Sequence, residues 1–262
     1  MTLRLLPYLA VLLLVLTQCR KKNDPAPGTP GAPRLSRITN ESGQLLAEFG
    51  YRPDGKLSNY KQYSAGVSLP NRTEDYAYDA QGRLERVDVA TAIGNILTRS
   101  EEVMAYGSAG KVETVTISQV SGTQRFPSAQ IRLEYDASGR VSKSSLLGAS
   151  NGTYALSSYD TYAYDGRGNV TKTESFFASN QPLSRLTYEY DTRPNPFRTA
   201  GRMQWAASYQ SPNNATREKY EYLGPTGGTS PNYDRPITYQ YNGAGYPTQA
   251  TQDGIVFKYV YE

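Results

Sequence analysis

The sequence YDAQGRL at residues 78–84 decides the fold of this 262-residue chain, because it recurs along most of the sequence. Full or near-full copies are YRPDGKL at 51–57, YGSAGKV at 106–112, YDASGRV at 135–141 and YDGRGNV at 164–170. Degenerate copies begin at Tyr190 and Tyr241. The glycines of the first five copies are spaced by 27, 28, 29 and 29 residues. A period of this length indicates a repeated supersecondary unit.

Each copy follows a stretch in which large apolar residues alternate with polar ones, as in Tyr76 and Tyr78. A period of two places those side chains on one face of a β-strand. The Asp of the motif can accept hydrogen bonds from nearby main-chain N–H groups, and the Gly suits the left-handed position of a type I turn with a bulge. Val87 and Val89 are out of phase with Leu84, and a one-residue bulge would restore the phase.

Two strands for each copy predict an all-β antiparallel meander of roughly fifteen to seventeen strands, with no helix beyond the N-terminal segment. After Asp191 the connections become longer and irregular. A circular barrel of this size would have a lumen too wide for side chains to fill. We therefore expect the sheet to curl into a flattened or open barrel-like form, with its tyrosine-rich face covered. A sheet that turns this face to lipid as an outer-membrane barrel is the less favoured alternative.

The N-terminal residues predict export. Residues 1–18 combine Arg4 with an apolar run that is too short to span a bilayer as a helix, which is typical of a signal peptide. The sole cysteine, Cys19, follows directly and is the predicted lipid attachment site of a bacterial lipoprotein. Residues 19–33 then form a Pro- and Gly-rich tether, and residues 34–262 form the β-repeat domain.

The motif Y-D-x-x-G-R-[LV], repeated over residues 45–260, resembles the YD repeat of Rhs-type bacterial proteins. Gly107 replaces the Asp in one copy, and Pro194 replaces the Gly in another. Large Rhs proteins coil many repeats into a shell around a toxin, for which this chain has too few copies. The chain resembles more closely a family of small Bacteroidetes-type lipoproteins of unknown function with a porin-like β fold. That resemblance implies an architecture and no activity.

The composition argues against an enzyme. The chain has no His and one Cys, which removes His-based catalysis and any His or multi-Cys metal site, and we expect no cofactor. The repeated Asp residues are expected to serve the turns. Glu101 and Glu102 are adjacent in a strand and point to opposite faces, so they do not form a paired-acid site. Trp205 and Tyr209 are candidates for stacking on a ligand such as a sugar ring.

These observations favour a non-enzymatic, lipid-anchored module of the cell envelope that binds or interacts with a partner. The expected location is the outer membrane, on its periplasmic or its surface side. The alternative is a carbohydrate-binding accessory lipoprotein, and an outer-membrane β-barrel is less favoured. The expected partners are the membrane, through the lipid, and a glycan or an envelope protein. No nucleic acid is expected, because residues 34–262 carry a net charge of only +1. The sequence leaves the ligand and the oligomeric state open.

Overall fold

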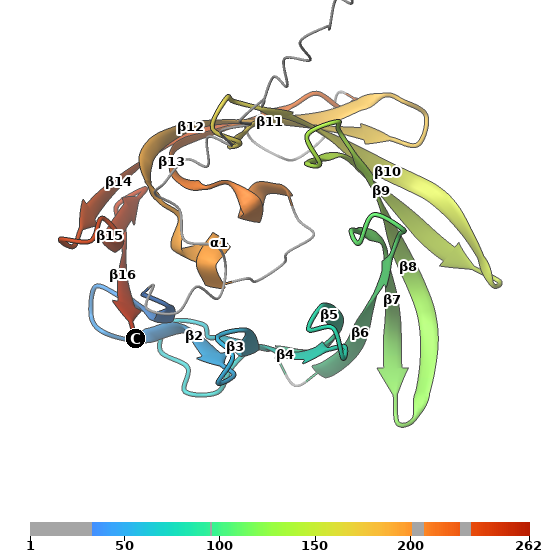
Figure 1. The fold of residues 1–262 in the computed structure, drawn as a ribbon, viewed down its shortest axis with the longest axis horizontal. Helices are drawn as coiled ribbons and strands as arrows, with labels where there is room; N and C mark the ends of the chain where they lie inside the picture. Colours follow the sequence, from blue (N-terminus) through green and yellow to red (C-terminus); the bar gives the residue numbers. More distant parts are fainter. Residues whose placement is uncertain (1–32, 95, 201–206, 226–231) are drawn as a thin grey trace, which may run out of the picture.

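The computed structural model describes residues 33–94, 96–200, 207–225 and 232–262. Sixteen antiparallel strands follow one another around a single sheet, and the first strand pairs with the last to close a barrel (Figure 1). The strands are β1 (Leu35–Asn40), β2 (Leu45–Tyr51), β3 (Leu57–Gln62), β4 (Arg72–Tyr78), β5 (Leu84–Ile93), β6 (Ile96–Tyr106), β7 (Val112–Ser121), β8 (Gln124–Tyr135), β9 (Val141–Ser150), β10 (Thr153–Tyr164), β11 (Val170–Phe177), β12 (Pro182–Pro194), β13 (Asn213–Tyr222), β14 (Tyr233–Tyr241), β15 (Pro247–Gln252) and β16 (Ile255–Tyr261). The predicted all-β antiparallel meander is confirmed.

The barrel closes where the two ends of the domain meet. Leu35 of β1 pairs with Tyr261 of β16, and Asn40 pairs with Phe257. Arg34 and Glu262 exchange two main-chain hydrogen bonds and form an ion pair of 3.1 Å. The chain therefore enters the barrel beside the place where it ends. The expected barrel-like sheet is confirmed, but its open form is wrong, because this last seam is paired.

The repeated motif makes the tight turn that the sequence predicts. In the copy at 78–84, the Gly82 N–H donates to the Asp79 carbonyl, and the Asp79 N–H donates to the Arg83 carbonyl, both at 2.9 Å. The Asp79 carboxylate accepts hydrogen bonds from the main-chain N–H groups of Gln81 and Arg83. Gly82 has a φ of +74°, which few residues other than glycine adopt. The register shifts next to Tyr78, as the predicted bulge requires.

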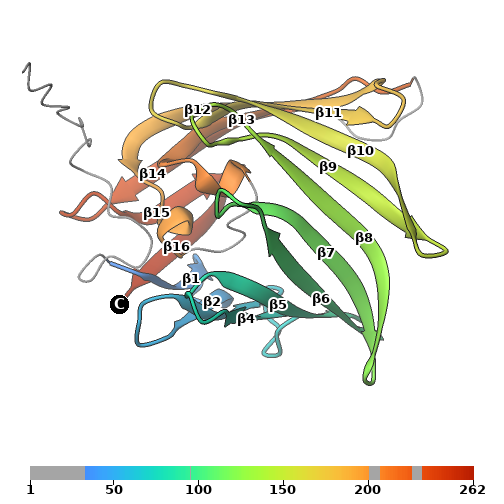
Figure 2. The same cartoon turned by 45° about the vertical axis from the view of Figure 1, so that its right-hand side comes forward.

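All the motif turns lie at one end of the barrel, here called the turn end. It comprises the turns at 52–56, 79–83, 107–111, 136–140, 165–169 and 242–246, together with Arg34 and Glu262. The opposite end, here called the loop end, holds the hairpins of more variable length, such as residues 63–71 and 223–232. Figure 2 shows the long hairpins β7–β8 and β9–β10 reaching beyond the neighbouring strands at that end. The described residues thus begin, at Pro33 and Arg34, at the turn end.

A ladder of tyrosine hydroxyls ties each turn to the one before it. In each case the first Tyr of a motif copy donates its hydroxyl to the carbonyl of a residue that begins an earlier strand. The bonds are Tyr51 to Leu35, Tyr78 to Leu57, Tyr106 to Leu84, Tyr135 to Val112, Tyr164 to Val141 and Tyr190 to Val170, at 2.6–2.8 Å. The bulge leaves these carbonyls free to accept, so the repeat supplies both partners.

Basic side chains cover the same rings. The guanidinium carbon of Arg83 lies 4.5 Å from the ring centroid of Tyr106, and that of Arg140 lies 4.4 Å from the centroid of Tyr164. Lys111 covers Tyr135 in the same way, at 4.9 Å. Cation–π contacts of this kind contribute about 0.5–1 kcal/mol at exposed sites. The basic residue after each of these glycines therefore links its hairpin to the next one through the following Tyr ring.

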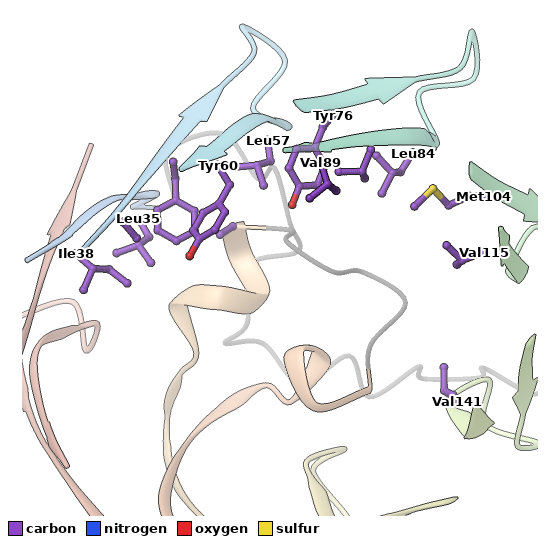
Figure 3. Packing of buried hydrophobic residues seen from close by; sticks show 14 of the residues in the cluster. Leu35, Ile38, Leu57, Tyr60, Tyr76, Leu84, Val89, Met104, Val115 and Val141 are labelled. Atoms are coloured by element: carbon purple, nitrogen blue, oxygen red, sulfur yellow. The ribbon is translucent and has the colours of Figure 1, made fainter. Parts of the chain in front are cut away.

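The aromatic face points into the barrel. Leu57, Leu84, Val115 and Val170 are almost wholly buried, and the motif tyrosines pack against them. Figure 3 shows a row of these side chains, from Ile38 through Tyr60 and Tyr76 to Met104 and Val115, along the inner wall. The prediction that the phenolic rings share one side of the sheet is confirmed.

The chain itself fills part of the wide lumen. The connection between β12 and β13 turns inward and carries the short helix α1 (Pro196–Ala200) and the 3-10 helix η1 (Ala207–Gln210) (Figure 1). The Phe197 ring lies 6.5 Å from that of Phe49 and 6.2 Å from that of Tyr259. The prediction that no helix follows the N-terminal segment is wrong here. The inserted connection covers aromatic surface that the lumen would otherwise leave open.

The outer wall carries ion pairs. Thr173 faces inward and is nearly buried, so the next residue of β11, Glu174, faces outward. Glu174 lies 2.8 Å from both Lys172 and Arg185, and Arg185 reaches on to Glu221 of β13 at 3.5 Å. Further outward pairs join Lys219 to Glu221 and Arg217 to Asp234 and Glu189. The outer wall over β11 to β14 is therefore charged.

Candidate functional site

A cavity of about 700 Å³ occupies the lumen beside the inserted connection. Its walls come from β1 to β3 on one side, β12 to β16 on the other, and the residues around α1 and η1. The site therefore joins the first strands of the chain to the last ones, and barrel closure is what brings these strands together.

Aromatic side chains make most of the wall. They come from strands whose alternation puts every second residue inside, and from the inserted connection. The rings are those of Phe49, Tyr60, Tyr63, Tyr188, Tyr190, Phe197, Tyr209, Tyr239, Phe257 and Tyr259. Such rings offer flat apolar faces with polar edges, on which a sugar ring or an organic cation can stack.

The polar lining is largely uncharged. Gln62 and Gln252 come from the inner faces of β3 and β15, and Asn195, Ser211 and Asn213 come from the two ends of the connection. Glu218 is the one carboxylate among the described lining residues, which include no Lys or Arg. Amide and hydroxyl groups of this kind can both donate and accept hydrogen bonds with a neutral polar ligand.

A buried polar network anchors the connection. Asn169 is fully buried, and its side chain donates to Asp165 at 2.9 Å and to Asn213 at 3.1 Å. Asn169 Oδ1 in turn accepts from the Asn213 N–H at 3.0 Å. The Ser211 hydroxyl accepts from the Val170 N–H at 3.1 Å. Arg83 and Arg140 occupy the place of Asn169 in their own copies, and the shorter asparagine makes room for the connection.

Asp191 performs a second anchoring role. The spacing of the turn residues along the repeat predicts that Asp191 lies in a turn, but β12 runs through it to Pro194. Its carboxylate accepts from the main-chain N–H groups of Arg193 and Asn214, at 2.9 and 3.1 Å, and from the hydroxyl of Tyr241. This carboxylate therefore ties β12, β13 and β14 together at the mouth of the connection.

Burial keeps the tyrosines of the lumen protonated. Burial, partly offset by a hydrogen bond to Ser211, raises the pKa of Tyr190 to about 12. Burial also raises the pKa of Tyr188 and of Tyr239 well above the ordinary value. These phenols are neutral at physiological pH, so the cavity wall presents hydroxyl groups and no phenolate.

The predicted site residues fall in different places. Tyr209 lies on η1 and lines the cavity. Trp205 and the predicted lipid site Cys19 lie outside the described residues. The repeated carboxylates of Asp54, Asp79 and Asp136 accept main-chain hydrogen bonds within their own turns, as expected.

Sequence reasoning missed Glu218 and the amide side chains of the wall. Their alternation with outward residues on β13 and β3 was the available signal, but it could not tell which strands would face each other across the lumen. Within the described ranges, no group of three or more His, Cys, Asp or Glu residues is placed to hold a metal ion. The described helices include none with the length and apolar character needed to cross a membrane.

Comparisons with known proteins find structures of related appearance. No family model matches the chain, and no curated protein matches it. A porin-like protein from Bacteroides vulgatus is 13% identical with a TM-score of 0.42, over 87% of this chain and 99% of that one. A porin-like protein from Bacteroides uniformis is 12% identical with a TM-score of 0.38, over 87% and 96%. The Photorhabdus luminescens Tc holotoxin pore is 14% identical with a TM-score of 0.31, over 78% of this chain and 12% of that one.

Proposed function

We propose that this protein is a non-enzymatic binding module of the bacterial cell envelope, held to a membrane by lipid on Cys19, and that its ligand enters the lumen. The observation that carries the proposal is the cavity of about 700 Å³ with aromatic and amide walls. A cavity of this size suits a small molecule or a short segment of a larger one. The tether at the turn end would leave the loop end free to face a partner.

The lining supports binding without catalysis. Hydrolysis of a glycosidic bond ordinarily uses two carboxyl groups on opposite sides of the bond. Glu218 is the single carboxylate that the described residues contribute to the cavity wall. The other polar groups there are amides and hydroxyls, which can orient a ligand through hydrogen bonds.

The outer wall supports attachment by lipid alone. Glu174, Arg185 and Glu221 form a chain of ion pairs across β11, β12 and β13. Charged side chains on the lipid-facing side of a membrane barrel cost about 2–4 kcal/mol for each Arg or Lys at the bilayer midplane. An aqueous environment for this wall is therefore favoured over the alternative of an embedded outer-membrane barrel.

A carbohydrate is the ligand class that the wall favours. Flat rings such as those of Tyr209 and Tyr239 can stack on the apolar faces of a sugar, while Gln62 and Gln252 can bond its hydroxyl groups. A peptide segment from an envelope protein is the alternative.

A glycan array tests the carbohydrate proposal with the full-length protein in detergent. We expect a subset of glycans to bind, Tyr209→Ala and Trp205→Ala to weaken that binding, and Tyr159→Ala to leave it unchanged. Tyr159 is a matched control, because it stacks on Phe176 at 4.9 Å and is absent from the cavity wall. Failure of every glycan to bind would remove carbohydrate as the ligand.

A further inference from the structure

Glu218 occupies a distinctive place in the cavity. It lies on β13, directly across from Tyr188 of β12 and from Arg235 of β14. Tyr188 packs against the core inside the barrel, so Glu218 faces the lumen as well. Its side chain is half-buried and belongs to the wall of the cavity.

The Glu218 carboxylate has no cation within ion-pair distance among the described residues. Its hydrogen-bond partner is the hydroxyl of Tyr233, which donates at 2.5 Å. Arg235 is the nearest basic residue by register, but its guanidinium bonds Asp253 at 2.8 Å and stacks 4.0 Å above the Tyr233 ring. The Glu218 carboxylate, which lines an aromatic cavity, thus accepts its hydrogen bond from a neutral group, the Tyr233 hydroxyl.

Two physical effects make such a cavity selective for positive charge. A carboxylate that loses water on ligand binding is stabilised when the ligand supplies a cation. The faces of Tyr and Phe rings also attract ammonium groups, by about 0.5–2 kcal/mol according to how far the site is desolvated. Among the described residues, the wall holds no Lys or Arg that would repel such a ligand.

We propose that the lumen cavity binds a ligand that carries an ammonium group, with Glu218 as its counter-ion and the surrounding rings as its aromatic walls. This inference rests on the proposed binding function and names the charge of the ligand. An amino sugar combines both chemistries, because it offers a ring to stack on the tyrosines and a cation for Glu218. A neutral sugar would leave the carboxylate with Tyr233 alone.

Calorimetric titration with two matched saccharides tests the proposal. Oligomers of glucosamine carry ammonium groups, while oligomers of N-acetylglucosamine of the same length are neutral. We expect the full-length protein to bind the glucosamine oligomer at least about tenfold more tightly, which corresponds to about 1.4 kcal/mol. Tetramethylammonium serves as a probe that carries the charge without the sugar, and we expect it to bind in competition with the glucosamine oligomer.

Two variants distinguish the effect of the Glu218 carboxylate on binding from an effect on folding. Glu218→Gln retains an acceptor for Tyr233 and should abolish the preference for the charged oligomer. Glu221→Gln lies on the outward face of the same strand and should leave the preference intact. Circular dichroism of both variants should match the parent protein.

Each outcome bears on a different claim. Equal binding of the two oligomers, or a preference that survives in Glu218→Gln, would overturn the inference while the carbohydrate proposal stands. Binding of tetramethylammonium without either oligomer would support the inference and remove carbohydrate. If none of the three ligands binds, the inference is overturned.

Discussion

The hydroxyl of Tyr135 donates a hydrogen bond of 2.6 Å to the main-chain carbonyl of Val112, which belongs to the preceding copy of the repeat. The same relationship recurs in six successive copies, from Tyr51 to Tyr190. It links residues that lie 16 to 23 positions apart in the sequence, in addition to the sheet hydrogen bonds. The repeat therefore specifies the fold of each hairpin and also its attachment to its neighbour.

Removal of one of these tyrosine hydroxyls should destabilise the barrel. We expect Tyr135→Phe to lower the free energy of unfolding by about 0.5–1.5 kcal/mol, because the Val112 carbonyl loses its donor while the ring stays in place. Denaturant unfolding followed by circular dichroism measures the change. Tyr154→Phe is the control, since no described residue bonds the Tyr154 hydroxyl, and it should have no effect. Equal losses of unfolding free energy in the two variants would contradict a stabilising role for the hydrogen bond from Tyr135 to Val112.

The turn glycines should resist substitution for a conformational reason. Gly110 has a φ of +70°, and a Cβ there would meet no atom within 4 Å. Gly110→Ala should therefore cost about 1–2 kcal/mol through backbone strain alone. Gly148, in β9, also has open space around a Cβ but carries no positive φ, so Gly148→Ala should be neutral or slightly stabilising. Thermal unfolding measures the stability of both variants. A Gly110→Ala variant as stable as the parent protein would argue against a positive φ at this turn.

Alkaline pH should unfold the protein. Burial raises the pKa of Tyr162 and of Tyr164 to about 12, from an ordinary value of 10. The folded state therefore retains protons that the unfolded chain releases, and stability falls as the pH rises from about 10 toward 12. Tyrosinate absorbance and circular dichroism should change together over that range. Release of most tyrosine protons near pH 10 with the fold intact would contradict this expectation.

The anchor of the connection should be sensitive to one substitution. We expect Asn169→Ala to destabilise the protein by about 1–3 kcal/mol, because Asn213 and Asp165 lose buried partners. It should also weaken ligand binding, since Asn213 and Ser211 line the cavity. Arg140→Ala removes the equivalent residue of the preceding copy and should cost no more than about 1 kcal/mol without affecting binding. Equal effects on binding would show that the connection does not depend on Asn169.

Loss of the lipid site should release the protein from the membrane. We expect Cys19→Ser to move the protein from the membrane fraction to the soluble fraction of cells. The expected reason is that the charged outer wall at Glu174 and Arg185 favours water over lipid. Fractionation with and without high salt separates embedding from electrostatic adsorption. A variant that stays in the membrane fraction after a salt wash would instead favour an embedded barrel.

The sequence by itself determined the hairpins. Period-two alternation, the Asp of each turn and a glycine that tolerates positive φ act within a few residues, so residues 78–84 specify the same turn wherever they occur. The same local pattern places the motif rings on one face of the sheet. Tyr209, a candidate from sequence for stacking on a ligand, lines the cavity, and its contact with a ligand stays a prediction.

Only the tertiary structure decided how the sheet closes and what its lumen contains. The pairing of Leu35 with Tyr261 joins residues at opposite ends of the chain, and no local pattern encodes that distance. The place of Glu218 depends on the same closure, together with the inward path of the connection around Phe197. Local hydrogen bonding and sterics fix a turn, whereas a cavity arises from contacts among many strands whose mutual positions depend on packing of the whole barrel.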